Sequence, residues 1–295
     1  MARRRGVGLA GALTESFVLL RPPSSRLPEG FLLPVFSSAA LRSSVISRLR
    51  AAGCVFAEDE ARILLAAAAS PADLAAKVRA RADGHPLEHV VGWAEFAGLR
   101  IAVDPGVFVP RRRSEFLAAA ATALAGPGSV VLDLCCGSGA LGAAVAAGVA
   151  HPVELHAADI DPTAVRCARR NLAGTGARVH EGDLFAALPD ALRGRVDVLI
   201  ANVPYVPTGD LALLPPEARL HEARPALDGG ADGLDVLRRM VEEAPRWLAP
   251  GGSLLFETSE RQAPAALAVT RAAGLAAVES RHEDLDATVV TATLR

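Results

Sequence analysis

A glycine-rich turn between an apolar stretch and a helix is the first part of this sequence that could do chemistry. Residues 130–134 have the apolar run of a buried parallel strand, and an alanine-rich segment suited to a helix begins at Gly139. Gly137 and Gly139 lack a Cβ, so the backbone there can approach a ligand closely. The start of the helix adds unpaired N–H groups and a partial positive charge. Together these features predict a nucleotide-sized site at the carboxyl end of a sheet.

The glycine turn alone leaves the ligand open. Gly137, Gly139 and Gly142 satisfy the pattern G-x-G-x-x-G, and Asp159 follows about 20 residues later, as in dinucleotide-binding folds. We favour S-adenosylmethionine (SAM) as the ligand. A nicotinamide or flavin dinucleotide, or tight packing of strand against helix with no ligand, are the alternatives.

Two acidic residues stand where the next two predicted strands end. The Asp159 carboxylate can accept hydrogen bonds from both ribose hydroxyls of a nucleoside. Asp183 can accept a hydrogen bond from an adenine amino group, with Leu184 and Phe185 packed near the ring. Helix capping competes with both interpretations. Asp161 before Pro162 suits the cap better than Asp159 does, whereas capping by Asp183 remains a real alternative.

The tetrapeptide Asn202-Val203-Pro204-Tyr205 directly follows the fourth predicted strand, at the same edge of the sheet. It suits methylation of a planar –NH2 group, a poor nucleophile because its lone pair is delocalised. The Asn202 side-chain oxygen and the Val203 carbonyl can each accept one N–H, which orients the nitrogen and favours pyramidal geometry as charge develops. Pro204 keeps Val203 extended, and Tyr205 can stack on a flat substrate. An ordinary Asn-x-Pro turn with a packing tyrosine is the alternative.

The order of elements that would position these residues predicts an α/β fold. Strand and helix alternate from residue 130 onward, which requires a doubly wound parallel sheet with right-handed crossovers. The last two predicted strands are joined by a link too short for a crossover helix, so they form an antiparallel C-terminal hairpin. This mostly parallel, seven-stranded, Rossmann-like sheet is the class I SAM-dependent methyltransferase pattern. The predicted strands are 130–134, 154–159, 178–181, 196–201, 253–258, 276–281 and 288–294, and the predicted helices are 139–148, 162–172, 234–248 and 261–273.

Four segments are expected along the chain. Residues 1–40 are rich in Arg, Ser and Pro and are predicted to be a disordered extension or to follow a misplaced start codon, with a targeting peptide as the alternative. Residues 41–90 form a small helical domain, in which Ser70 caps a helix that starts with Pro71. Residues 91–112 are a linker with a hairpin, whose arms are expected at 89–92 and 96–103. Residues 113–295 are the methyltransferase domain, entered through a helix capped near Ser114.

Composition excludes several classes of protein. The 295 residues are 51% hydrophobic and 22% charged, with a net charge of −2, so a nucleic-acid partner is not expected. Cys54, Cys135, Cys136 and Cys167 show no metal-ligand spacing, so we expect no metal site and a reducing cytoplasm. The chain lacks an apolar run of membrane-spanning length, so no membrane association is expected. The sequence predicts no oligomeric state.

Taken together, these motifs resemble the HemK/PrmC protein-(glutamine-N5) methyltransferases from about Glu60 to the C-terminus. The matching segments are 86–92, 95–96, 105–111, 133–139, 159, 182–185, 202–205, 222, 226–235 and 248–252. The resemblance implies a cytoplasmic, SAM-dependent enzyme whose acceptor glutamine lies in the Gly-Gly-Gln loop of a peptide-chain release factor. It implies SAM contacts by Cys135, Cys136, Gly137, Ser138, Gly139, Asp159, Leu184 and Asn202, and it assigns Asn202, Val203, Pro204 and Tyr205 to the acceptor.

Departures from the family pattern indicate a divergent member. Val203 replaces the first proline of the usual Asn-Pro-Pro-Tyr, and Cys135 replaces the first glycine of the cofactor loop. Asn followed by an aliphatic residue, Pro and Tyr also resembles the ribosomal-RNA adenine dimethyltransferases. A nucleic-acid adenine-N6 methyltransferase and a non-catalytic SAM-binding module are therefore the alternative functions. Residues 206–232 form a long proline-rich connection, interpreted as a substrate-facing flap.

Overall fold

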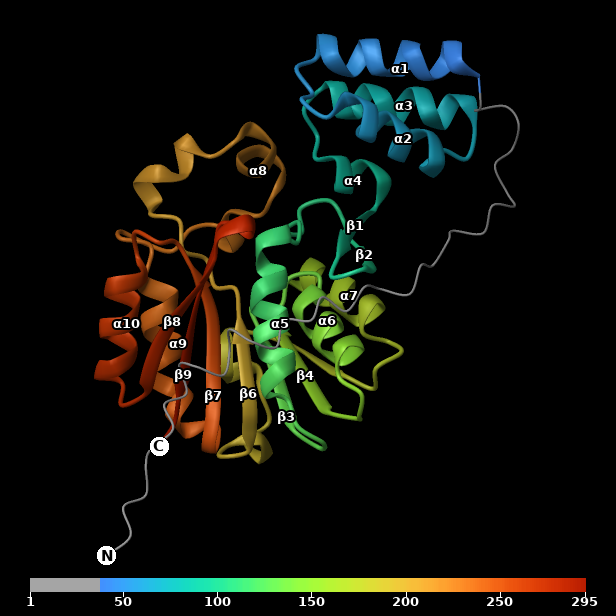
Figure 1. The fold of residues 1–295 in the computed structure, drawn as a ribbon. Coiled ribbons are helices and arrows are strands. Elements are labelled where there is room, and N and C mark those ends of the chain that lie inside the picture. The colour runs from blue at the N-terminus through green and yellow to red at the C-terminus, as the bar shows by residue number, and fades with distance from the viewer. Residues whose placement is uncertain (1–37) are drawn as a thin grey trace, which may run out of the picture. The chain divides into compact units, whose positions relative to one another are not determined.

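The computed structural model of the protein describes residues 38–295 (Figure 1). The predicted extension over residues 1–40 therefore lies outside the described residues, except for its last three positions. Ser38 caps helix α1 (Ala39–Ala51) by accepting a hydrogen bond from the Leu41 N–H at 3.1 Å. The first helix thus begins at Ala39 rather than at Leu41, because its cap precedes the apolar pattern.

Three helices pack side by side near the start of the described chain (Figure 1). They are α1, α2 (Ala57–Ala67) and α3 (Pro71–Ala82), and Val45, Leu49 and Leu64 are buried between them. The predicted cap is confirmed, since Ser70 accepts a hydrogen bond from the Asp73 N–H at 3.1 Å. The helices are confirmed, whereas the division of the chain into domains at residues 90 and 112 stays a prediction.

The predicted hairpin is present, but its first arm was placed wrongly. Residues expected as that arm form a short helix, α4 (Leu87–Val91), which Gly92 ends in the left-handed conformation at φ 82°. The hairpin that follows pairs β1 (Trp93–Phe96) with β2 (Leu99–Ala102) in antiparallel register. The β-branched pair Val90-Val91 favoured a strand locally, but a glycine cap after one turn of helix moves the arm to β1.

The main sheet has seven strands in the order β5-β4-β3-β6-β7-β9-β8, which confirms the predicted fold class. The first five strands in this order are mutually parallel, and β9 pairs antiparallel with both β7 and β8. The strands are β3 (Val130–Leu134), β4 (Glu154–Asp159), β5 (Arg178–Glu181), β6 (Val196–Ala201), β7 (Leu248–Thr258), β8 (Ala276–His282) and β9 (Ala287–Thr293). Strand β7 starts earlier than predicted because Leu248 pairs with Val196 before a shift in register.

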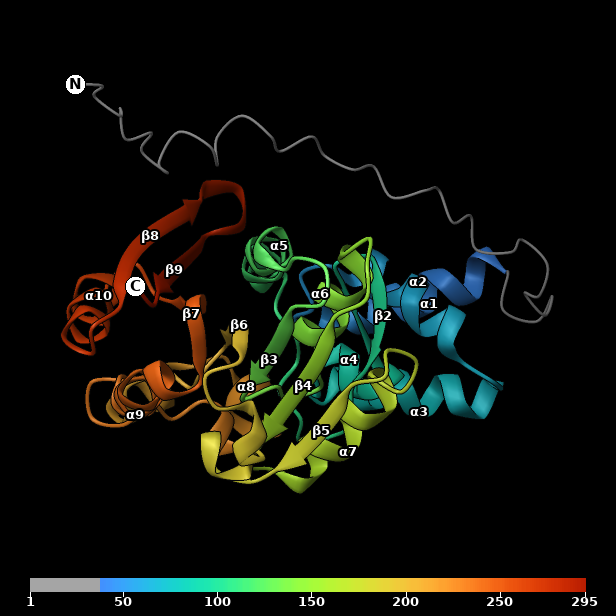
Figure 2. The same cartoon turned by 90° about the horizontal axis from the view of Figure 1, so that it is seen from below.

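Helices cover both faces of this sheet, which explains why β3 is buried along its whole length. On one face α5 (Glu115–Leu124), α6 (Ala140–Gly148) and α7 (Pro162–Asn171) share a core with residues such as Val131 and Leu255. On the other face α9 (Asp235–Glu243) and α10 (Ala263–Ala272) pack against residues such as Leu132 and Phe256. Figure 2 shows α5 and α9 on opposite sides of the strands.

The flap, defined as residues 206–232, leaves the sheet after β6 and returns before α9. It contains α8 (Pro216–His221) between two short 3₁₀ turns, more regular structure than its composition predicted. Its two ends meet, because the Gly229 N–H donates to the Val206 carbonyl at 2.8 Å. The Gln262 side-chain amide donates to the carbonyls of both Tyr205 and Asp232, at 2.9 and 3.1 Å.

Within residues 38–295 we find no helix with the length and apolar character needed to cross a membrane.

Candidate functional site

A cavity of about 610 Å³ lies beyond the carboxyl ends of β3, β4 and β6. The flap contributes to its wall through residues such as Leu214 and Ala218, and Figure 1 shows α8 above the same end of the sheet. Every residue predicted for the site lines this cavity except Gly139 and Phe185, whose ring is stacked on Trp247 in the core. Those lining it are Cys135, Cys136, Gly137, Ser138, Asp159, Asp183, Leu184, Asn202, Val203, Pro204 and Tyr205.

Each of the three glycines of the turn is required for a different physical reason. A Cβ on Gly139 would lie 3.2 Å from the Ala168 backbone in α7, so this glycine allows close packing behind the cavity. A Cβ on Gly142 would lie 3.1 Å from the Asp133 carboxylate. A Cβ on Gly137 would meet nothing within 4 Å, because that position faces the open cavity. Of the three, Gly137 is therefore the one whose missing side chain leaves room for a ligand.

Asp159 connects the glycine turn to the start of α7. Its Oδ2 accepts a hydrogen bond from the Gly137 N–H at 2.8 Å, and its Oδ1 accepts one from the Asp161 N–H at 2.9 Å. Burial raises the pKa of Asp159. Asp161 caps α7, as predicted, by accepting from the Thr163 N–H at 2.8 Å. Each oxygen of Asp159 keeps a second lone pair, which can accept a hydroxyl of a ligand in the cavity.

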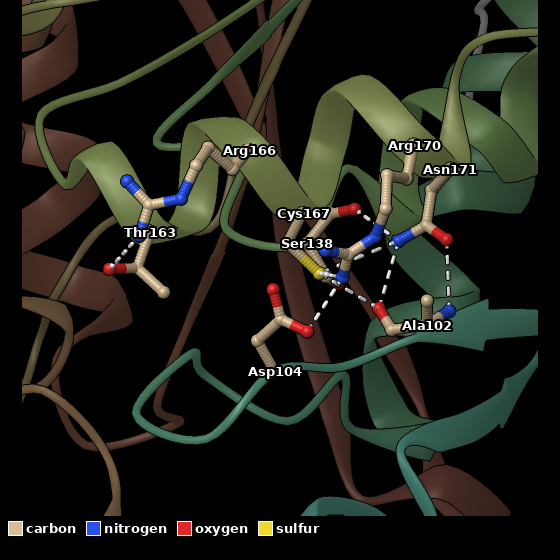
Figure 3. Close-up of polar contacts among 8 residues, drawn as sticks. All are labelled: Ala102, Asp104, Ser138, Thr163, Arg166, Cys167, Arg170 and Asn171. Atoms are coloured by element: carbon tan, nitrogen blue, oxygen red, sulfur yellow. Dashed lines mark hydrogen bonds and ion pairs between the residues drawn. The ribbon is translucent and has the colours of Figure 1, made fainter.

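Asn171, near the end of α7, joins the glycine turn to the hairpin (Figure 3). Its Oδ1 accepts from the Ala102 N–H at 2.9 Å, and its Nδ2 donates to the carbonyls of Ala102 and Ser138 at 2.9 and 2.8 Å. Next to it, Arg170 pairs with Asp104 at 2.7 Å. We did not predict this contribution from the sequence, since a single asparagine at a helix end carries no signal of a distant partner.

Asp183 does not make the capping hydrogen bond that competed with its predicted role. Its Oδ2 instead pairs with the Arg239 guanidinium of α9 at 2.5 Å. Both residues line the cavity together with the buried Leu184. Arg239 was not predicted, and its pairing leaves the second Asp183 oxygen as the acceptor available to a ligand.

A network of three polar side chains lies behind the Asn202 tetrapeptide: the half-buried Arg113 and the buried Ser114 and Glu257. The Glu257 side chain is 1% exposed and accepts from the Ser114 hydroxyl at 2.6 Å and from Arg113 Nε at 2.8 Å. Arg113 Nη2 and the Tyr205 hydroxyl are 2.6 Å apart, and the Tyr205 hydroxyl also donates to Glu257 at 3.3 Å. The Asn202 amide joins through Nδ2, which donates to Ser114 Oγ at 3.3 Å.

The contacts of this network show that the predicted capping role of Ser114 is wrong, and they define which of its side chains are charged. Ser114 does not cap α5: its own backbone is helical, at φ −70° and ψ −9°, and its hydroxyl is bound to Glu257. Burial raises the pKa of Tyr205, and the Glu257 charge acts in the same direction. Burial lowers the pKa of Arg113, but Tyr205 and Glu257 outweigh this and hold it above its usual value. The tyrosine therefore stays a neutral phenol beside an Arg–Glu ion pair.

Several acceptor atoms of the tetrapeptide have no hydrogen-bond partner within residues 38–295, and two of them suit an amide acceptor. These are Asn202 Oδ1, whose nitrogen faces Ser114, and the Val203 carbonyl. The Val203 side chain is buried in the core of the sheet, so the residue meets the cavity mainly through its backbone. Two acceptors on adjacent residues of one cavity wall can bind a group that carries two N–H donors.

Asp133 lies beneath the turn and is fully buried. Its Oδ2 accepts from the Gly142 N–H at 2.8 Å, and its Oδ1 has no partner. Burial raises the pKa of Asp133 to about 7. In the described part of the chain, we find no group of three side chains suited to hold a metal ion.

Comparison with known proteins gives consistent matches. Residues 98–230 match the family model of the methyltransferase small domain. The chain is 41% identical over 203 residues to a release factor glutamine methyltransferase of Geobacter sulfurreducens, covering 67% of this chain and 70% of the relative. It is 39% identical over 204 residues to a 4-amino-L-phenylalanine/4-methylamino-L-phenylalanine methyltransferase of Streptomyces pristinaespiralis, covering 67% and 69%. A solved methyltransferase from Pyrococcus furiosus shares the fold, with a TM-score of 0.50 at 18% identity over 66% of this chain and 88% of that one.

Proposed function

Because the chain belongs to the release factor glutamine methyltransferase family, we propose that it methylates a glutamine side-chain amide of a peptide-chain release factor, with SAM as methyl donor. We infer the class of methyl acceptor from two unpartnered hydrogen-bond acceptors, Asn202 Oδ1 and the Val203 carbonyl. Both residues line the same cavity as Asp159. The proposal places the protein in the cytoplasm with a release factor as its partner.

The residues of the turn fit a nucleoside cofactor. The open position at Gly137 leaves room for it, Asp159 has lone pairs for the ribose hydroxyls, and Asp183 has one for an amino group. Leu184 supplies an apolar surface for the base. When bound here, SAM supplies an electrophilic methyl group. These residues would hold it, with Cys135, Cys136, Ser138 and Gly139 completing the turn.

The tetrapeptide supplies the orientation that an amide nitrogen needs. Such a nitrogen is a weak nucleophile, since its lone pair is shared with the carbonyl. Acceptance of its two N–H groups by Asn202 and Val203 would fix the direction of the lone pair and stabilise positive charge on nitrogen. The ring of Tyr205 lines the same cavity and is held at its hydroxyl, so it can flank the flat amide as a rigid wall.

An arylamine acceptor is the second candidate, favoured by the relative that acts on 4-amino-L-phenylalanine. An arylamine nitrogen is also planar and also carries two N–H donors, so the same two acceptors suit it. Adenine shares this chemistry, but the net charge of −2 disfavours nucleic acid. A non-catalytic binding module would not need unpartnered acceptors at Asn202 and Val203.

The proposal is tested by incubating the protein with labelled SAM and three acceptors separately: a release factor, 4-aminophenylalanine and an adenine-containing oligonucleotide. We expect label in the release factor, with the mass of one added methylene on the glutamine of its Gly-Gly-Gln loop. A release factor with that glutamine changed to glutamate, which has no amide nitrogen, is the control. Label confined to either of the other acceptors would replace the proposed substrate.

A further inference from the structure

We propose that Ser114 and Glu257 are positioning residues that set the direction of the Asn202 side-chain amide. They ensure that Asn202 Oδ1, and not its nitrogen, faces the acceptor in the cavity. The inference rests on the proposed function, and it adds two residues, remote from the tetrapeptide in sequence, to the reaction.

The number of hydrogen atoms available along these hydrogen bonds fixes the direction of each one. A serine hydroxyl has one hydrogen, and a carboxylate can only accept. Glu257 is a carboxylate here, because it forms an ion pair with Arg113 at 2.8 Å. Ser114 must therefore donate its hydrogen to Glu257, at 2.6 Å. The lone pairs of Ser114 Oγ remain for Asn202, so Asn202 has to present its nitrogen, at 3.3 Å.

Because its partners are buried, the orientation of the Asn202 amide is fixed by the protein and not by water. Ser114 is 3% exposed and Glu257 is 2% exposed, so water cannot readily substitute for either partner. The other oxygen of Glu257 accepts from Arg113 and from the Tyr205 hydroxyl. One carboxylate therefore orients two residues of the tetrapeptide, Tyr205 directly and Asn202 through Ser114.

The direction matters because the two ends of an amide have the same shape and opposite hydrogen-bonding character. With Asn202 reversed, its N–H donors would face the N–H donors of the acceptor. The hydrogen bond would be lost, and like partial charges would oppose each other. A change that reverses the chain of hydrogen bonds should therefore harm the reaction more than one that only interrupts it.

Two substitutions separate these cases. Ser114→Ala interrupts the chain and leaves Asn202 able to adopt either direction, so kcat should fall by roughly 2- to 10-fold, less than the loss of a whole preorganised group. Glu257→Gln keeps an oxygen for Arg113 but places an amide donor toward Ser114. The Ser114 hydrogen then turns to Asn202 and reverses its amide, so kcat should fall on the order of 100-fold. Ser114→Thr keeps the hydroxyl and should restore most of the activity.

The experiment measures kcat and KM for a release factor, SAM affinity by calorimetry and the melting temperature for each variant. We expect the loss in kcat with SAM affinity nearly unchanged. Ser253→Ala is the matched control, since Ser253 is a buried serine whose hydroxyl is bonded to Thr293 at 3.0 Å, and it does not line the cavity. Equal losses of kcat in Ser114→Ala and Ser253→Ala would reduce Ser114 to a structural role and overturn the inference.

A double-mutant cycle tests whether Ser114 acts through Asn202. Ser114→Ala should cost nothing further in a protein that already carries Asn202→Ala, because the amide to be oriented is gone. If the two losses multiply instead, Ser114 acts by another route and the inference is wrong.

A spectroscopic measurement keeps the inference separate from the proposed function. The Asn202 side-chain amide signals, identified in a ¹⁵N spectrum by their absence from Asn202→Ala, should shift in Ser114→Ala and in Glu257→Gln without any acceptor present. Unchanged signals would refute the positioning role even in an active enzyme. A protein that methylates no release factor but shows these shifts would contradict the proposed substrate and retain the network.

Discussion

Replacing Asp159 by alanine should lower both the stability of the ligand-free protein and its affinity for SAM. The carboxylate holds two backbone N–H groups, of Gly137 and Asp161, at 2.8 and 2.9 Å. A buried donor left without an acceptor costs about 1–3 kcal/mol. The cavity can admit water to Gly137, and removal of a buried charge relieves its desolvation. We therefore expect a loss in unfolding free energy of about 2 kcal/mol, at the lower end of the range for two such groups.

The loss of SAM affinity has a separate origin. A hydrogen bond to a charged group contributes about 1.5–3 kcal/mol, so the dissociation constant should rise roughly 10- to 150-fold. Calorimetric titration with SAM measures this change, and urea unfolding of the ligand-free protein measures the change in stability. Asp159→Asn, which keeps one carbonyl oxygen, should fall between the wild type and Asp159→Ala in both.

Asp197→Ala is the matched control for this prediction. Asp197 accepts a hydrogen bond from the Val130 N–H at 2.8 Å, at the start of β3 and β6 and therefore at the opposite end of the sheet. Its loss should reduce stability without changing SAM affinity. Wild-type SAM affinity in Asp159→Ala would refute the ribose role. Unchanged stability would refute the link between the glycine turn and α7.

Three further outcomes are expected. Asn202→Ala should lower kcat by about 10²–10³-fold with little change in SAM affinity, as methyl transfer and calorimetry would show, whereas Val203→Pro keeps the carbonyl and should stay active. Burial raises the pKa of native Asp133 to about 7, whereas an unfolded aspartate has a pKa near 3.8. The stability of the wild type relative to Asp133→Asn should therefore fall as the pH rises through this window, which urea unfolding at about pH 5 and about pH 8 would detect. Asn171→Ala removes the bonds to Ala102 and Ser138 and should weaken SAM binding and lower the melting temperature, with wild-type values in both contradicting its bridging role.

The sheet could be predicted closely because its signals are local. Strands β3, β4, β5 and β6 have the predicted bounds. Strands β3 and β6 are apolar runs followed by polar turns, and β4 and β5 end in the acidic residues Asp159 and Glu181. Asp161-Pro162 marks the start of α7 in the same way. The short helix α4 was missed because five residues are too few to show a helical period.

The residues behind the site could not be predicted, because their partners are distant in sequence. Ser114 resembles a helix cap in sequence and Glu257 resembles the polar end of a strand, yet the packing of α5 beside β7 brings the two within 2.6 Å. Arg239 reads as an exposed helix residue until α9 packs beside Asp183. The tetrapeptide itself was found because its four residue types are adjacent, and its role remains a proposal that the substitutions above test.

Because the two ends of the flap are bonded to each other, the length of the flap can vary without disturbing the rest of the fold. Gly229 bonds to Val206, and Gln262 bonds to both Tyr205 and Asp232, so closure of the loop does not depend on what lies between. The entropy of closing a flexible loop grows only with the logarithm of its length, about 0.6 kcal/mol for each doubling. Segments inserted between the two bonded ends of the flap would therefore cost little stability. Insertions and deletions in the flap would change which methyl acceptors fit, while the cofactor half of the cavity stays constant.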